Sequence, residues 1–125
     1  MIPTQIVDEV STLKDEGNSV EVIEAEGWVN VIFSNYAVPP KFSKTSITLL
    51  VKLPLSYPNG RPEMFWTDVD LLFKDGRTPR SAEQIETVVG RQWRRFSWYP
   101  TSWNPGADNL RTYLEFINNR LAKSE

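Results

Sequence analysis

A stretch rich in proline and aromatic residues does most to limit the folds that this chain can adopt. It covers residues 53–66 and reads LPLSYPNGRPEMFW, with three prolines within nine residues. Each proline fixes φ and removes a backbone donor, so the stretch is predicted to be neither a helix nor part of a strand ladder. An apolar run at residues 47–53 leads into it and is long enough for a buried strand. The sequence therefore predicts a strand that passes through a rigid loop, with the ring of Tyr57 packed on the core, into a further strand.

One helix and four strands are predicted for the first half of the chain. Residues 3–16 carry apolar side chains on one helical stripe. Residues 20–25 and 28–34 have the pattern of a β-hairpin, and residues 47–53 and 63–66 are the third and fourth strands. A helix followed by a meander of four strands is typical of an α+β fold with an antiparallel sheet.

The second half of the chain has a less regular pattern until its last helix. Residues 81–89 are predicted to form one or two helical turns, with Ile85 on their apolar side. Residues 91–103 fit neither the helical nor the strand period. A final helix is predicted after Asp108, which is a suitable N-cap residue. Its apolar stripe follows the helical spacing and consists of Leu110, Tyr113, Leu114, Ile117 and Leu121.

Length and charge indicate one ordinary globular domain. The 125 residues are the size of a single domain, so we expect one domain over residues 1–125. The net charge of −2 and the pI near 5.2 argue against a general nucleic-acid-binding protein, since such domains carry a clear basic excess. No apolar span approaches the length of a membrane helix and no signal-peptide pattern is visible, so a soluble, cytoplasmic protein is expected, with no membrane partner.

The lack of cysteine and histidine removes several kinds of chemistry. Without them the chain offers no disulfide, no thiol nucleophile and no imidazole base, which excludes Cys–His dyads, Ser–His–Asp triads and the usual zinc sites. Asp68 and Asp70 have the spacing of a carboxylate pair but no further ligands near them, so neither a metal nor a cofactor is predicted. Lys41 and Lys44 are interpreted as solvated charges.

The order of these features resembles the ubiquitin-conjugating (E2) fold, also called UBC-like. That family has an N-terminal helix, a four-stranded meander and a Tyr-Pro loop that leads into a strand of the F-x-T type. The matching residues here are Tyr57–Pro58, Pro62 and Phe65–Thr67. A second match is Trp103–Pro105, a Trp-x-Pro sequence shortly before a helix. The continuation at residues 106–110, GADNL, is most similar to the prokaryotic E2 family E.

The chain departs from the family pattern at the expected active site. E2 enzymes carry a His-Pro-Asn motif and a catalytic cysteine between these two landmarks, whereas this sequence has FKDG at residues 73–76 and no cysteine. A thioester therefore cannot form on this chain. Three explanations stay open: a non-catalytic E2-like adaptor, a protein that uses a hydroxyl as acyl acceptor, or a chain in which a cysteine has been replaced.

Ser97 is the residue that the resemblance places where an E2-like nucleophile is expected. Its hydroxyl would take the C-terminal acyl group of a ubiquitin-like protein as an oxyester, with Thr101 and Ser102 as weaker candidates. A serine needs an activating base, and the chain has no histidine. A bound partner or a carboxylate would have to act as that base, the candidates being Asp70, Asp75 and Asp108. The alternative interpretation is an ordinary loop serine.

A cluster of basic and aromatic residues lies within residues 91–103. Its members with the strongest partner-binding character are Arg94, Arg95, Trp98, Tyr99 and Trp103, because Trp, Tyr and Arg are the preferred anchors of protein interfaces. Single-stranded nucleic acid is a second possibility, which the acidic pI opposes. The third is that the aromatic rings belong to the core and the arginines cover its rim.

The resemblance implies a function in a prokaryotic ubiquitin-like protein conjugation pathway. The expected partners are a ubiquitin-like protein and an E1-like activating enzyme, with no nucleic acid. The chain would either carry the ubiquitin-like protein as an oxyester or act as an E2 variant without cysteine. The alternative is a non-catalytic adaptor or peptide-binding module that uses the surface of residues 91–103.

Overall fold

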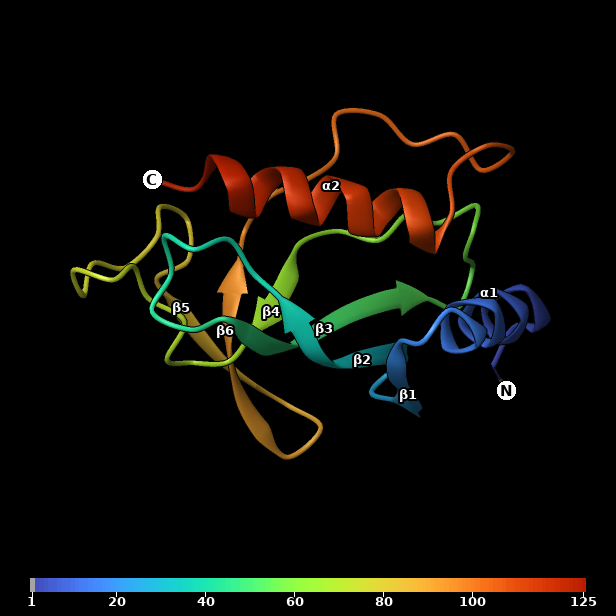
Figure 1. Cartoon of the computed structure of the whole chain (residues 1–125). Coiled ribbons are helices and arrows are strands. Elements are labelled where there is room, and N and C mark those ends of the chain that lie inside the picture. Colours follow the sequence, from blue (N-terminus) through green and yellow to red (C-terminus); the bar gives the residue numbers. More distant parts are fainter. Residues whose placement is uncertain (1) are drawn as a thin grey trace.

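The structure is a computed structural model that describes residues 2–125, and its described part contains two helices and six strands. Figure 1 shows α2 over one face of a single twisted sheet and α1 at the end of the sheet near β1, β2 and β3. In chain order the elements are α1 (Thr4–Asp15), β1 (Ser19–Ala25), β2 (Trp28–Ala37), β3 (Ser46–Pro54), β4 (Phe65–Thr67), β5 (Gln84–Val88), β6 (Arg91–Phe96) and α2 (Leu110–Lys123).

The six strands form one antiparallel sheet in the order β1-β2-β3-β4-β6-β5. The α+β class is therefore confirmed, as are the N-terminal helix, the meander of β1 to β4 and the C-terminal helix. The sheet is larger than the predicted four strands because the β5–β6 hairpin joins it beyond β4. No helix within residues 2–125 is long and apolar enough to cross a membrane.

The helical prediction for residues 81–89 is wrong, because this segment contains β5. Ile85 and its neighbours fit a helical stripe, but the chain reverses at Val89 and Gly90, which have φ angles of 49° and 71°. Positive φ at two successive residues suits a tight β-hairpin turn. The turn pairs β5 with β6, for example Glu86 with Trp93. Pairing with a later segment thus overrides the local pattern, and part of the irregular segment 91–103 becomes a strand.

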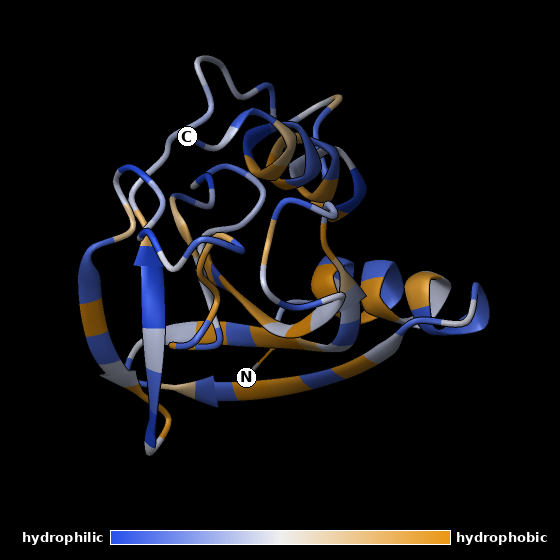
Figure 2. Ribbon diagram, turned by 60° about the vertical axis from the view of Figure 1, so that its left-hand side comes forward, coloured by the Kyte–Doolittle hydropathy of each residue, from blue (hydrophilic) through white to orange (hydrophobic). Residues whose placement is uncertain are grey.

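The main core lies between the sheet and the two helices. α1 contributes Ile6, Val10 and Leu13, and the facing residues of β2 are Val29, Val31 and Phe33. Hydrophobic and hydrophilic residues alternate along both helices (Figure 2). All five residues of the predicted stripe on α2 are buried, which confirms that face. Residues from helices at both ends of the chain therefore close one core.

A second, smaller cluster packs on the opposite face of the sheet. It consists of Leu50, Trp66, Val88 and Trp93, which are all at most 4% exposed. Successive residues of a strand point to opposite faces, so Leu49 enters the main core and Leu50 the second cluster. This burial on both faces explains why Leu49, Leu50 and Val51 are consecutive apolar residues at the centre of β3.

Two local boundaries differ from the prediction. Pro54 is the last residue of β3 and lies opposite Trp28, so the ladder includes the first proline of the 53–66 stretch. The N-cap of α2 is Asn109 and not Asp108. The Asn109 side chain accepts a hydrogen bond from the Thr112 amide, and the Thr112 hydroxyl accepts one from the Asn109 amide. This reciprocal capping box satisfies two otherwise unpaired donors of the first turn.

Candidate functional site

The two sequence landmarks, the Tyr-Pro loop and the Trp-x-Pro turn, are in direct contact. The indole N–H of Trp103 donates a hydrogen bond of 2.8 Å to the carbonyl of Pro58. The Trp103 ring also packs between Tyr57 and Tyr113, with ring centroids 6.1 and 6.5 Å apart. Tyr57 is only 4% exposed, so its predicted packing on the core is confirmed. The loop after β3 and the segment before α2 are thus held together by one tryptophan.

A single carboxylate joins α1 to both of these segments. Glu9 accepts a 2.6 Å hydrogen bond from the hydroxyl of Tyr57 and a 2.8 Å hydrogen bond from the amide of Leu110. The Leu110 amide is one of the unpaired donors at the start of α2, where a negative charge also complements the helix dipole. Burial, followed by the hydrogen bond with Glu9, raises the pKa of Tyr57 well above its usual range. Glu9 therefore fixes where α2 begins relative to the Tyr-Pro loop.

A cleft of about 330 Å³ runs between residues 100–103 and α2. Figure 1 shows the segment that leaves β6 arching over α2 before the helix begins. Hydroxyl groups of Thr101 and Ser102 line the cleft from the loop. Asp108 lies at the end near the start of α2, and Arg120 and Lys123 lie toward its end. The cleft therefore combines hydroxyl groups with opposite charges at its two ends.

A family model described as prokaryotic E2 family E matches residues 6–124. The chain belongs to this family. No curated protein and no solved structure gives a significant match. The family match covers nearly the whole chain, from the first turn of α1 to the end of α2, and it includes every residue that lines the 330 Å³ cleft.

Ser97, the predicted acyl acceptor, lies just after β6. Its amide donates to the carbonyl of Ser81 at 2.9 Å, and its hydroxyl accepts a 3.0 Å hydrogen bond from Nε of Arg95. Among the residues that the structure describes, no carboxylate contacts this hydroxyl. Ser97 also does not line the cleft beside α2, whereas Thr101 and Ser102 do. The geometry gives Ser97 a cationic neighbour but no base.

The three carboxylates considered as that base are each engaged elsewhere. Asp70 binds Lys44 at 3.0 Å, and Asp75 binds Nε of Arg77 at 2.6 Å. Hydrogen bonds from the backbone and side chain of Arg77 lower the pKa of Asp75, which makes it a weaker base. Asp108 accepts from the amide of Asn104 at 2.7 Å and from a threonine hydroxyl of α2 at 3.2 Å.

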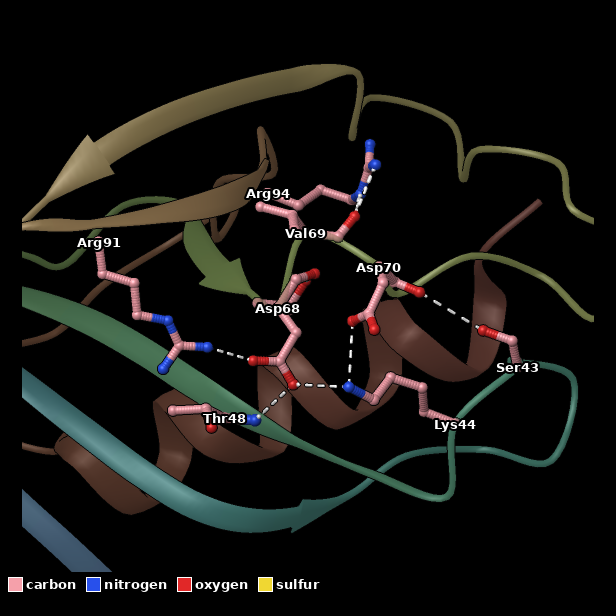
Figure 3. A network of polar contacts seen from close by, with 9 residues as sticks. Ser43, Lys44, Thr48, Asp68, Val69, Asp70, Arg91 and Arg94 are labelled. Carbon is pink, nitrogen blue, oxygen red and sulfur yellow. Dashed lines mark hydrogen bonds and ion pairs between the residues drawn. The ribbon is translucent and has the colours of Figure 1, made fainter.

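Arg94 and Arg95, predicted to bind a partner, point to opposite faces of the sheet. The guanidinium of Arg94 donates to the carbonyl of Val69 at 2.8 and 3.0 Å (Figure 3). It also donates to the carbonyl of Ala82 at 2.7 Å. Burial lowers the pKa of Arg94. Arg95 binds Glu86 at 2.8 Å on the face of the sheet that carries the second cluster. Neither residue lines the cleft beside α2.

A charged network holds the segment that follows β4, as Figure 3 shows. Lys44 binds Asp68 at 3.3 Å as well as Asp70, so its interpretation as a solvated charge is wrong. Asp68 is also bound by Arg91 and accepts a 3.1 Å hydrogen bond from the amide of Thr48. The two aspartates therefore bind cations of the chain itself, and within residues 2–125 no group of three or more acidic residues is placed to hold a metal ion.

Lys41 is likewise bound rather than solvated. Its ammonium group donates to the carbonyls of Ala122 and Ser124, at 2.5 and 2.8 Å. These carbonyls belong to the C-terminal end of α2, which carries unpaired acceptors and partial negative charge. The loop between β2 and β3 therefore fixes the end of α2.

The aromatic members of the predicted cluster lie near the cleft. Trp98 packs against the main core and carries the guanidinium of Arg120 over its ring, 3.6 Å from the centroid. Tyr99 is 49% exposed, and Trp103 lines the cleft. Sequence reasoning missed Glu9 and the position of Arg120, because a single acidic residue on a helix or a basic residue in its last turn carries no signal of a distant contact.

Proposed function

We propose that this protein is an E2-like component of a prokaryotic ubiquitin-like conjugation pathway that binds its partners without forming its own thioester. Membership of the prokaryotic E2 family E supports the pathway. One observation supports binding without a thioester. The Tyr-Pro loop and the Trp-x-Pro turn are joined by the hydrogen bond from Trp103 to Pro58, but the sequence has no cysteine to act as nucleophile. We propose a ubiquitin-like protein or an E1-like activating enzyme as the bound partner.

The contacts of Ser97 favour the binding form of this proposal over the oxyester form. An oxyester needs a base to take the hydroxyl proton during attack. The neighbour of the Ser97 hydroxyl is instead the guanidinium of Arg95, which donates a hydrogen bond and has no capacity to accept one. An oxyester on Ser97 would therefore depend on a base brought by the partner.

We place the partner contact on the exposed aromatic residues beside the cleft. Tyr99 offers a large side chain to solvent, and Trp98 and Trp103 hold the loop that presents it. Tyrosine and tryptophan supply contact area at a low cost in side-chain entropy, which makes them frequent anchors of interfaces. Arg94 and Arg95 would act in this proposal by holding the strand from which the loop leaves.

The experiment combines an adduct assay with a binding assay. The protein is incubated with ATP and the E1-like and ubiquitin-like proteins encoded in the same genome, and adducts are separated on denaturing gels with and without hydroxide or thiol. We expect no adduct on this chain, together with saturable binding of one partner. A hydroxide-labile, thiol-resistant adduct that Ser97→Ala abolishes would instead establish the oxyester form.

Two exposed-residue variants test the binding surface. Tyr99→Ala is expected to weaken partner binding by about tenfold or more, as for an interface anchor worth more than 1 kcal/mol. Ile85→Ala is the control, because Ile85 is 42% exposed on β5, away from the cleft. Equal affinities of the two variants would contradict the placement of the interface, and absence of binding to either partner would contradict the function.

A further inference from the structure

Arg120 is an unusual residue for the last turns of a helix. Cations there complement the helix dipole, and this is reason enough for a solvated arginine or lysine. Arg120 is instead half-buried, with its guanidinium on the ring of Trp98, and its Nε atom is buried without a hydrogen-bond partner. Since buried polar groups of proteins are normally paired, the helix dipole alone does not explain this arrangement.

A second cation lies beside it without a counter-ion. Lys123 is three residues further along α2 and lines the same cleft. In the part of the chain that the structure describes, no carboxylate forms an ion pair with Arg120 or Lys123, although seven ion pairs occur elsewhere. Like charges at this spacing repel each other on a helix. An anion bound between them would relieve that repulsion.

The remaining lining of the cleft suits the main chain of a peptide. Thr101, Ser102 and Asn119 supply neutral hydrogen-bonding groups, and Trp103 and Phe116 supply apolar surface. The cleft follows α2 from Thr112 to Lys123, a rise of about 17 Å at 1.5 Å per residue. An extended peptide of about five residues has this length. Its volume of about 330 Å³ lies at the lower end of the range for ligand sites.

Charge orients such a peptide. The acidic Asp108 lies at the N-terminal end of α2 and the cations at its C-terminal end, so the two ends of the cleft attract opposite ends of a chain. A terminal carboxylate is planar and matches the guanidinium fork, and as the end of a chain it can enter a recess beside a half-buried arginine. We propose that this cleft binds the terminal carboxylate of an extended peptide through Arg120 and Lys123, with Trp98 holding the arginine in place.

This inference needs only the cleft and holds whether or not the protein works in ubiquitin-like conjugation. The test is an NMR titration of the isotope-labelled full chain with acetyl-pentaalanine as the free acid, and separately with its C-terminal amide and with sodium acetate. We expect the free acid to shift the Arg120 Nε–H signal and the Trp98 and Trp103 indole signals in a saturable way. The amide and acetate are expected to bind at least about tenfold more weakly, since each lacks part of the ligand.

Three charge-neutralising variants locate the site. Arg120→Gln and Lys123→Gln are each expected to weaken binding of the free acid severalfold, and Lys123 is exposed enough that its replacement leaves the fold intact. Arg111→Gln is the matched control, because it removes one positive charge from the first turn of α2, outside the cleft, and should change affinity by less than twofold. Equal binding of acid and amide, equal binding of acetate and peptide, or unchanged affinity in Lys123→Gln would each overturn the proposal.

Discussion

Replacement of Glu9 by alanine tests how α1, the Tyr-Pro loop and the start of α2 are held together. The change removes one acceptor from two donors, the hydroxyl of Tyr57 and the amide of Leu110, which lie 48 and 101 residues away in sequence. Both donors belong to residues that are at most 4% exposed. A hydrogen bond to a charged group contributes about 1.5–3 kcal/mol, and leaving its partner unpaired costs about 1–3 kcal/mol.

The open cleft around Glu9 makes the expected loss of stability smaller than the sum of these hydrogen-bond energies. Glu9 lines an open cleft of about 210 Å³ together with Thr12 and Arg111, so water can reach part of the space that the carboxylate leaves. We therefore expect the free energy of unfolding to fall by about 2–4 kcal/mol, near the upper range for single substitutions. With a urea m-value of about 2 kcal/mol per M, the midpoint of unfolding would drop by about 1–2 M.

Urea titrations followed by tryptophan fluorescence and circular dichroism measure this loss. Asp8→Ala is the matched control, since the neighbouring carboxylate is exposed and forms no hydrogen bond or ion pair within the described residues. This change should alter stability by less than about 0.5 kcal/mol. A double-mutant cycle with Tyr57→Phe should give a coupling energy of about 1–2 kcal/mol. If Glu9→Ala is no less stable than Asp8→Ala, the Glu9 carboxylate does not stabilise the contact of α1 with the Tyr-Pro loop and α2.

Three further predictions concern the charged network, the pH dependence and the Tyr-Pro loop. Asp68→Ala should lower the free energy of unfolding, measured in urea, by about 2–3 kcal/mol because Asp68 is 13% exposed and accepts several hydrogen bonds. Asp70 is 67% exposed, so Asp70→Ala should cost less than about 1 kcal/mol. Equal losses in the two variants would contradict this prediction. Burial raises the pKa of Tyr36 to about 12 from an unfolded value near 10, so its contribution is complete below pH 10 and is lost between pH 10 and 12, at up to about 1.4 kcal/mol per pH unit. Stability measured against pH should fall less steeply there in Tyr36→Phe, and an unchanged slope would refute the assignment. In Gly60→Ala the new Cβ would lie 2.1 Å from Oγ of Ser56, an exposed side chain that can rotate away, and 3.0 Å from Cγ of Pro54, so a loss of about 1 kcal/mol is expected in thermal unfolding. In Gly106→Ala the nearest atom is 3.5 Å away, so stability should stay within about 0.5 kcal/mol.

The predicted elements that proved right are those with strong local signals. The stripe of α2, the hairpin of β1 and β2, and the apolar run of β3 each have enough periodic residues within one segment to define them. β5 and β6 have no such signal. Trp93 and Phe96 of β6 enter different clusters on opposite faces, and arginines separate them, so the alternation of a strand is hidden.

In the candidate site as well, only residues with a signal in the sequence could be predicted. The hydrogen bond between Trp103 and the Tyr-Pro loop was not predicted, although both landmarks follow from the family resemblance. The partners of Arg94 and Lys44 do not, since a surface cation in a sequence gives no sign of the carbonyl or carboxylate that it meets after folding. The positions of Glu9 and Arg120 depend on how the helices sit on the sheet, which only the assembled structure gives.

The burial of β3 on both faces has a consequence for folding. Leu49 and Leu50 are neighbours in the chain, yet they pack in two separate clusters, as do Phe65 and Trp66 of β4. Loss of β3 from the sheet would therefore open both clusters together. We infer that residues 2–125 unfold as one cooperative unit. A cavity made in the second cluster should then lower the protection from hydrogen exchange of residues in the main core.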